Sequence, residues 1–97
     1  MVDTSSISHG EKLLNALTQQ LCAERVGTVL RRHYADQRNA PKRLARRWRF
    51  TPRAFHGWLY GENPPAMHNL VALMAECEPL RNEVNRMVEE LRAVIAE

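Results

Sequence analysis

The sequence predicts an all-α protein, and three observations carry that prediction. Apolar residues recur at the spacing of an amphipathic helix in several separate segments of the 97-residue chain. No segment of strand length alternates apolar and polar residues with a period of two. Prolines and glycines stand between the periodic segments, where helices begin and end. We therefore expect a single small domain of five or six helices.

The N-terminal part is predicted to be a short tail followed by a helix. Residues 1–8 are mostly small and polar, and we expect a flexible tail there. Ser8 and Glu11 have the spacing of a capping box, so a helix should begin at about His9. Its apolar stripe, within residues 9–22, consists of leucines: Leu13, Leu14, Leu17 and Leu21.

A second apolar stripe follows directly. Its residues are Cys22, Val26, Val29, Leu30 and His33. On one straight helix the two stripes would point in directions roughly 160° apart. Residues 9–37 therefore form either two helices, with a break near residues 23–27, or one helix that serves the core on one side and a partner on the other. We favour two helices.

The segment 41–61 is predicted to form a helix, a tight turn and a second helix. Pro41 opens the first helix after the polar connector 36–40. One face of this helix is apolar, and it consists of Leu44, Ala45 and Trp48.

The second helix of this segment has signals at both ends. Thr51 is a good N-cap, and Pro52 follows at the first helical position, where its missing N–H leaves no hydrogen bond unmade. Gly61 supplies the stop. The apolar residues between them recur at i, i+3 and i+4, and they are Phe55, Trp58 and Leu59. We expect this aromatic side to be buried and the side that carries Arg53 to be open to solvent.

Two more helices are predicted after a rigid loop that ends in Pro64 and Pro65. The first ends near Cys77, and its stripe is Met67, Leu70, Val71 and Met74. The second begins at Pro79, and its longer stripe is Leu80, Val84, Met87, Val88, Leu91 and Ile95. The amphipathic segments 9–22 and 79–96 either pack on their own domain or form a homodimer interface.

Charge is unevenly distributed along the chain, although the net charge is only +3. Residues 25–53 contain ten basic residues and one acid, whereas residues 62–97 contain seven acids and three arginines. Residues 37–61 contain seven basic residues and no acid: Arg38, Lys42, Arg43, Arg46, Arg47, Arg49 and Arg53. Two helices with an apolar inner face and only positive charge outside suit a polyanion, and nucleic acid is the obvious candidate.

The composition argues against other classes of protein. No apolar run has the length of a membrane span, and the polar N-terminus lacks a signal-peptide core. Cys22 and Cys77 have no metal-ligand spacing, so we expect free thiols in a reducing cytoplasm. No catalytic triad, glycine-rich phosphate loop or metal-binding pattern is present. We therefore expect no enzymatic activity, no cofactor and no bound metal.

Four residues of the central segment resemble a known pattern. Ala45 in the first helix, Phe55 and Trp58 in the second, and Gly61 three residues after Trp58 are similar to the helix-turn-helix of the lambda-repressor/Cro-type (XRE-like) DNA-binding family. The resemblance covers residues 24–77, and it includes residues 27–32, 63–65 and 69–73. It implies a lambda-repressor-like domain over residues 9–97, with a core of 24–77 and additional helices at 9–22 and 79–96.

The turn departs from the family pattern at one position. The family commonly has glycine there, in a left-handed backbone conformation, and this chain has Arg49. A non-glycine residue in that conformation costs about 1 kcal/mol. A contact between Arg49 and a DNA phosphate would account for the arginine.

The resemblance also implies which residues contact DNA. The second helix of the motif, residues 52–60, would enter the major groove with its first residues at the base edges. The base-contacting residues are then Arg53, His56 and Gly57, although a plain phosphate contact is an equal alternative for Arg53. The backbone-contacting residues are Lys42, Arg43, Arg46, Arg47, Arg49, Thr51 and Tyr60. A weaker extension of the same surface consists of Arg31, Arg32 and Arg38.

The function implied by the resemblance is a sequence-specific, double-stranded-DNA-binding transcription regulator of bacterial or phage type. It would act in the cytoplasm at the nucleoid, and a homodimer would bind two half-sites about one helical turn apart. The alternative is a protein-interaction adaptor or antiactivator built on the same scaffold, because a fold alone does not settle function. Binding to structured RNA is a third possibility.

Overall fold

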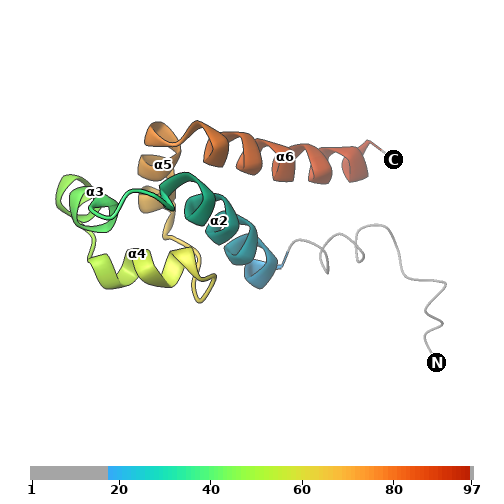
Figure 1. Ribbon diagram of the computed structural model, residues 1–97. Coiled ribbons are helices and arrows are strands. Elements are labelled where there is room, and N and C mark those ends of the chain that lie inside the picture. The colour runs from blue at the N-terminus through green and yellow to red at the C-terminus, as the bar shows by residue number, and fades with distance from the viewer. Residues whose placement is uncertain (1–17, 97) are drawn as a thin grey trace, which may run out of the picture.

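The computed structural model describes residues 18–96, and within them it contains five helices and no strand (Figure 1). The helices are α2 (Gln19–Tyr34), α3 (Ala40–Trp48), α4 (Pro52–Leu59), α5 (Met67–Glu76) and α6 (Glu78–Ile95). α2 packs against α4 and α6, while α3 packs on α4 and α5 packs on α6. The described chain is all-helical, as predicted. The expected tail at 1–8 and the expected helix start at His9 lie outside the described residues.

The prediction of a break near residues 23–27 is wrong. α2 begins after Thr18, whose Oγ1 accepts a hydrogen bond from the backbone N–H of Leu21 at 3.2 Å, and it runs unbroken to Tyr34. Gly27 lies inside this helix and is buried. A Cβ atom at Gly27 would stand 2.7 Å from a backbone carbonyl oxygen of α4. The close packing of α2 on α4 therefore requires a glycine at this helical position. Gly27 does not mark a loop.

The helix, tight turn and helix predicted for residues 41–61 are present. Arg49 follows α3 in the left-handed conformation expected of it, with φ 61° and ψ 40°. Thr51 caps α4, because its Oγ1 accepts a hydrogen bond from the backbone N–H of Ala54 at 3.0 Å. Pro52 is the first residue of α4, as predicted.

α4 ends in a Schellman motif. Gly61 has a positive φ of 70°, which glycine adopts without strain. Its N–H donates to the carbonyl oxygen of Trp58 at 3.3 Å, and the N–H of Glu62 donates to that of Gly57 at 2.9 Å. These two bonds satisfy carbonyl groups that a helix end otherwise leaves unpaired. The stop predicted at Gly61 therefore has a defined geometry.

The aromatic side of α4 is buried in the core, as predicted. Phe55 is fully buried, and its ring centroid lies 5.8 Å from that of Tyr34, 5.9 Å from that of Phe50 and 6.1 Å from that of Trp58. Burial raises the pKa of Tyr34 to about 12, so this side chain stays neutral. The buried cluster consists of Val26, Leu30, Tyr34, Ala40, Leu44, Phe55, Trp58, Leu73, Cys77, Leu80 and Met87.

Both cysteines are free thiols, as predicted. Cys22 is half-buried, and Cys77 is buried as the single residue between α5 and α6. Burial raises the pKa of the Cys77 thiol, which keeps it protonated and unreactive at neutral pH.

The apolar stripe predicted for α5 is only partly correct. Met67 and Val71 are 81% and 56% exposed, whereas Leu73, outside the predicted stripe, is fully buried. Leu70 and Met74 pack against the core beside Leu73. The buried face of α5 is therefore rotated away from Met67 and Val71, because only the side centred near Leu73 meets the core.

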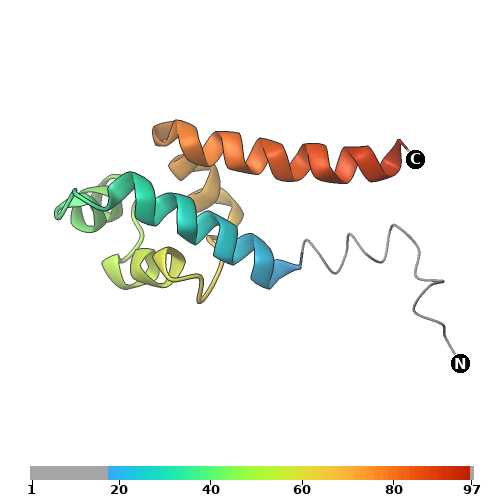
Figure 2. The ribbon, with the colours of Figure 1, turned by 45° about the vertical axis from the view of Figure 1, so that its right-hand side comes forward.

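The apolar stripe of α6 is buried only over its first half. Leu80 and Met87 are buried, whereas Val88, Leu91 and Ile95 are 48%, 42% and 83% exposed. α6 runs antiparallel to α2 and continues past the first turn of α2 (Figure 2). Within residues 18–96, the last turns of α6 therefore present apolar side chains that are only partly covered, and Ile95 is largely open. None of the five helices combines the length and apolar composition that crossing a bilayer requires.

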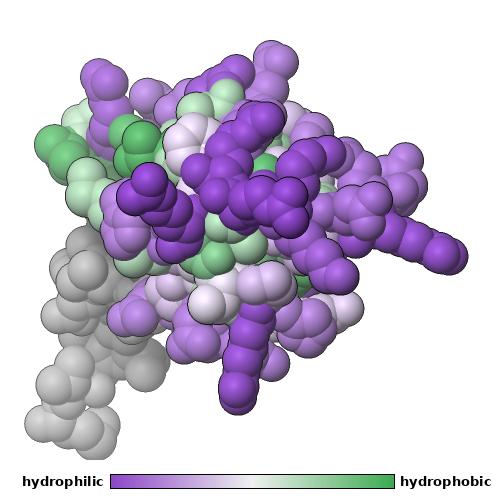
Figure 3. Space-filling model, turned by 90° about the vertical axis from the view of Figure 1, so that its left-hand side faces the viewer, coloured by the Kyte–Doolittle hydropathy of each residue, from purple (hydrophilic) through white to green (hydrophobic). Residues whose placement is uncertain are grey.

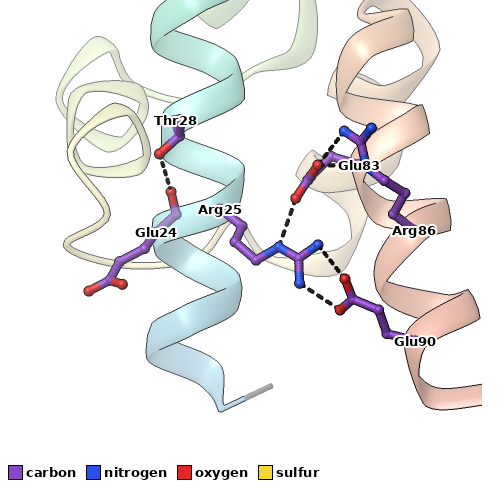
Figure 4. Close-up of polar contacts among 6 residues, drawn as sticks. All are labelled: Glu24, Arg25, Thr28, Glu83, Arg86 and Glu90. Atoms are coloured by element: carbon purple, nitrogen blue, oxygen red, sulfur yellow. Dashed lines mark hydrogen bonds and ion pairs between the residues drawn. The ribbon is translucent and has the colours of Figure 1, made fainter. Parts of the chain in front are cut away.

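An ion-pair cluster fastens α2 to α6 (Figure 4). Arg25 Nε lies 2.7 Å from Glu83 Oε2, and Arg25 Nη1 lies 2.7 Å from Glu90 Oε2. Burial alone would raise the pKa of Glu83, but hydrogen bonds from Arg25 and Arg86 outweigh it and hold that pKa below its ordinary value. The hydrogen bond from Arg25 likewise lowers the pKa of Glu90.

We expect Arg25→Met to lower the free energy of unfolding by about 1 kcal/mol at neutral pH and by less in acid. Glutamates with a lowered pKa contribute stability that is complete above their unfolded pKa of about 4.3 and is lost as the pH falls through the folded value. The difference in urea midpoint between the variant and the natural chain should therefore shrink below about pH 4. Arg92→Met, which removes an exposed pair with Glu89, is the control and should change little at any pH. An Arg25 effect of equal size at every pH would contradict the electrostatic explanation.

Candidate nucleic-acid interface

The seven basic residues of the segment 37–61 are all exposed. α3 and the start of α4, which carry most of them, lie at the same end of the molecule in both ribbon views (Figures 1 and 2). Hydrophilic side chains project from this end of the molecule (Figure 3). We call the seven the basic patch, and they are Arg38, Lys42, Arg43, Arg46, Arg47, Arg49 and Arg53.

Most of the basic patch has no carboxylate partner. Within residues 18–96, Arg47 alone of the seven forms an ion pair, with its Nη1 2.6 Å from Glu76 Oε1. Arg43 Nη2 donates to the neutral amide oxygen of Gln37 at 3.1 Å. The described part of the chain thus leaves most of this positive charge uncompensated. Three glutamates of α6, in contrast, each pair with an arginine: Glu83, Glu89 and Glu90.

The exposed face of α3 contains a shallow hollow of about 530 Å³. Four of its lining residues are cationic and belong to the basic patch, and the fifth is Asn39 at the start of the helix. Cations that border one solvent-open depression attract an anion such as a phosphate group. The cationic residues are Lys42, Arg43, Arg46 and Arg47.

The turn between α3 and α4 places Arg49 outside and Phe50 inside. Arg49 is exposed in its left-handed conformation, at a cost of about 1 kcal/mol relative to glycine. Phe50 packs against the core, and its ring centroid lies 4.7 Å from that of Trp58 and 5.9 Å from that of Phe55. Burial of Phe50 against α4 therefore holds the turn in this shape.

The outer face of α4 carries three of the predicted contact residues. Arg53, His56 and Tyr60 are all exposed, and the rings of His56 and Tyr60 lie 4.6 Å apart. Their spacing of three and four residues places them on one helix face. Trp58 and Phe55 are buried on the opposite side. α4 thus has the hidden aromatic side and the open arginine-bearing side that the sequence predicts.

Gly57 is not open to solvent, although it was predicted to contact bases. It is buried, and a Cβ atom there would lie 3.5 Å from Glu62 Oε2 and 3.8 Å from Asn63 Nδ2. The loop after α4 therefore fills the space beside this glycine. Glu62 and Asn63 also border, with Thr51 and Arg53, a depression of about 390 Å³. Sequence reasoning missed both loop residues, because their approach depends on how the chain turns after α4.

Two residues that were predicted to contact DNA, Thr51 and Arg47, also have structural roles in the fold. The oxygen of Thr51 caps α4, and its hydroxyl hydrogen remains available to a phosphate. Arg47 and the indole N–H of Trp48 both donate to the carboxylate of Glu76. Glu76 thereby ties the end of α3 to α5. No sequence signal reveals Glu76, which lies 29 residues from Arg47.

Arg31, which was predicted to extend the basic surface, contacts the end of α4. Its Nη1 donates a hydrogen bond to the backbone carbonyl oxygen of Leu59. Its guanidinium carbon also lies 5.9 Å from the centroid of the Tyr60 ring, within the range of a cation–π contact. The last carbonyl groups of a helix carry partial negative charge, so a cation is favourable there.

Within residues 18–96, no group of three or more His, Cys, Asp or Glu side chains is placed to hold a metal ion. Comparison of the chain with protein-family models, with characterised proteins and with solved structures gave no match. The class of ligand must therefore be inferred from the chemistry of the site.

Proposed function

We propose that the protein binds double-stranded DNA with sequence preference, as a transcription regulator of bacterial or phage type acting at the nucleoid. The observation that carries the proposal is the basic patch, in which six of seven exposed cations have no carboxylate partner within the described residues. Duplex DNA supplies the dense negative charge that such a surface needs. The resemblance to the lambda-repressor/Cro-type family supports duplex DNA over other polyanions. In this proposal the helix-turn-helix consists of α3, the turn after it and α4.

α4 is the element that we assign to the major groove. Arg53 is exposed in its first turn, and the first turn of a recognition helix is the part that reaches base edges. A guanidinium group can donate two hydrogen bonds to O6 and N7 of guanine, which gives about 1–3 kcal/mol of discrimination. His56 lies on the same face, and Tyr60 at the far end of the helix would meet a sugar or phosphate.

The cations of α3 and Arg49 are assigned to the DNA backbone. Four of them border the hollow on α3, and Arg49 stands in the turn that leads to α4. Each cation that neutralises a phosphate releases condensed ions from the DNA, so affinity should fall steeply as salt increases. Contacts of this kind fix the position of the protein but carry no base preference.

We expect Arg53→Ala and Arg46→Ala to weaken binding in different ways. Arg53→Ala should relax the preference at one base pair by about 1–3 kcal/mol. Arg46→Ala should weaken binding to every duplex and reduce the slope of log K against log salt by about 0.9. Affinities for duplexes selected from a random pool, measured at several salt concentrations, check both effects.

Arg92→Ala is the matched control, because this exposed arginine lies on α6 beside Glu89 and should alter neither quantity. If both interface variants weakened binding to all duplexes equally, the assignment of Arg53 as a base-contacting residue would be wrong. Weak binding of the natural chain to every duplex would refute the proposal. Selected duplexes with two-fold symmetry would show that two copies bind together.

The exposed apolar side chains of α5 and α6 favour a second candidate, a protein-interaction adaptor. Met67 and Val71 of α5 and Ile95 of α6 stand open to solvent within the described structure. Exposed apolar surface of this kind is often an interaction site. The adaptor predicts weak, sequence-independent binding to duplexes, so the same titration separates the two candidates.

A further inference from the structure

An apolar groove of about 240 Å³ lies where α2, α5, α6 and the loop before α5 meet. None of the residues that line it is charged. They include Cys22 and Val26 of α2, Pro65 of the loop, Leu70 of α5, and Met87 and Leu91 of α6. The groove is therefore suited to apolar side chains.

The apolar surface continues from the groove onto the open end of α6. Cys22 of α2 and Leu91 of α6 line the groove, and the two helices run antiparallel (Figure 2). One helical turn outward from these residues leads to Thr18 on α2 and to Ile95 on α6. Ile95 is more exposed than Leu91, at 83% against 42%. The groove therefore reaches to within about one helical turn of the point where the chain enters α2.

The residues that enter α2 carry apolar side chains next to this point. Leu17 directly precedes Thr18, and Leu13 and Leu14 lie within five residues of it. A chain of five residues spans at most about 18 Å, which is enough to reach the groove from Thr18. A tethered segment is present at an effective concentration in the mM range, far above that of a second copy at about micromolar concentration.

We propose that the chain's own Leu13, Leu14 and Leu17 pack on Leu91 and Ile95 and close the groove. The sequence leaves two alternatives open for the N-terminal apolar stripe: packing on its own domain or forming a homodimer interface. The proposed arrangement is the first of these. The inference does not depend on DNA binding.

A double-mutant cycle in the full chain tests the proposal. Combined substitution of the three leucines, Leu13→Asn, Leu14→Asn and Leu17→Asn, should lower the melting temperature by roughly 5–10 °C. Ile95→Asn should cause a similar loss, because it removes the other side of the same contact. The variant that combines all four changes should melt little below either parent. Glu11→Gln with Lys12→Gln, two polar positions of the same segment, is the control and should leave the melting temperature unchanged.

The mass in solution, measured over a range of protein concentrations, completes the test. We expect a monomer whose mass does not depend on concentration or on the three leucines. Additive losses of melting temperature, or no loss from the leucine substitutions, would overturn the proposal. A dimer that Ile95→Asn abolishes and the leucine substitutions leave intact would assign the groove to a second copy and would also overturn it. Neither readout involves DNA, so the outcome is independent of the proposed function.

Discussion

Replacing Phe55 with alanine should lower the free energy of unfolding by about 3–5 kcal/mol. Phe55 is fully buried, and its ring meets Tyr34 of α2, Phe50 of the turn and Trp58 of α4. Removing the ring leaves a cavity between all three elements, and the loss should displace α4 together with Arg53. Chemical denaturation of the natural chain and the variant measures the difference.

Tyr60→Ala is the matched control for Phe55→Ala, because it removes an aromatic ring from the exposed end of α4. The substitution removes only the exposed contact with Arg31. We therefore expect the free energy of unfolding to change by no more than about 0.5 kcal/mol. Similar losses from the two substitutions would contradict the central position assigned to Phe55.

Replacing Gly27 with alanine should lower the free energy of unfolding by about 3 kcal/mol, the upper end of the usual range for overpacking. The added Cβ atom would stand 2.7 Å from the carbonyl oxygen of Trp58 and 2.8 Å from that of Leu59. Both atoms belong to the backbone, so α4 must move to relieve the clash. Chemical denaturation measures the loss, and a change in near-ultraviolet circular dichroism would report the displaced tryptophan.

Gly57→Ala is the same substitution in another helix, and the opposite sign is expected. The nearest atoms are the ends of the Glu62 and Asn63 side chains, at ordinary contact distances of 3.5 Å and 3.8 Å. Alanine is favoured over glycine inside a helix by about 1 kcal/mol, so stability should rise slightly. Duplex affinity should also be kept, because the loop already fills this space. A loss of stability as large as that of Gly27→Ala would contradict both expectations.

The elements predicted most accurately are those whose signals act over a few residues. Thr51, Pro52 and Gly61 fix the two ends of α4 through hydrogen bonds and backbone angles within their own turns. The aromatic side of α4 follows from the spacing of Phe55 and Trp58. Arg53 lies on the side of α4 opposite these aromatic residues, so the prediction that it is exposed to solvent is confirmed.

The errors come from packing between distant segments. The two stripes of residues 9–37 indicate a change of direction but not its position, and the structure begins α2 after Thr18. In α5, the periodicity of apolar residues includes Val71, whereas the core meets the side of Leu73. The loop packed beside Gly57 likewise depends on the path of the chain after the helix.

The polar contacts between distant segments could not be predicted either. Arg31 reaches the end of α4 from 28 residues away, and Arg25 reaches α6 from 58 and 65 residues away. Composition indicates an excess of cations in this part of the chain, but it does not indicate which cation meets an acceptor. Within residues 18–96, only the structure shows that Arg47 is the one member of the basic patch with a carboxylate partner.

The pairing of Arg47 with Glu76 has a consequence for experiments on binding. If Arg47 meets a phosphate, its guanidinium exchanges one anion for another, while Glu76 keeps its hydrogen bond to the indole of Trp48. The exchange leaves a carboxylate uncovered as the phosphate is neutralised, so the net gain in charge pairing is small. The phosphate number deduced from a salt titration would then be smaller than the number of arginines that touch the DNA.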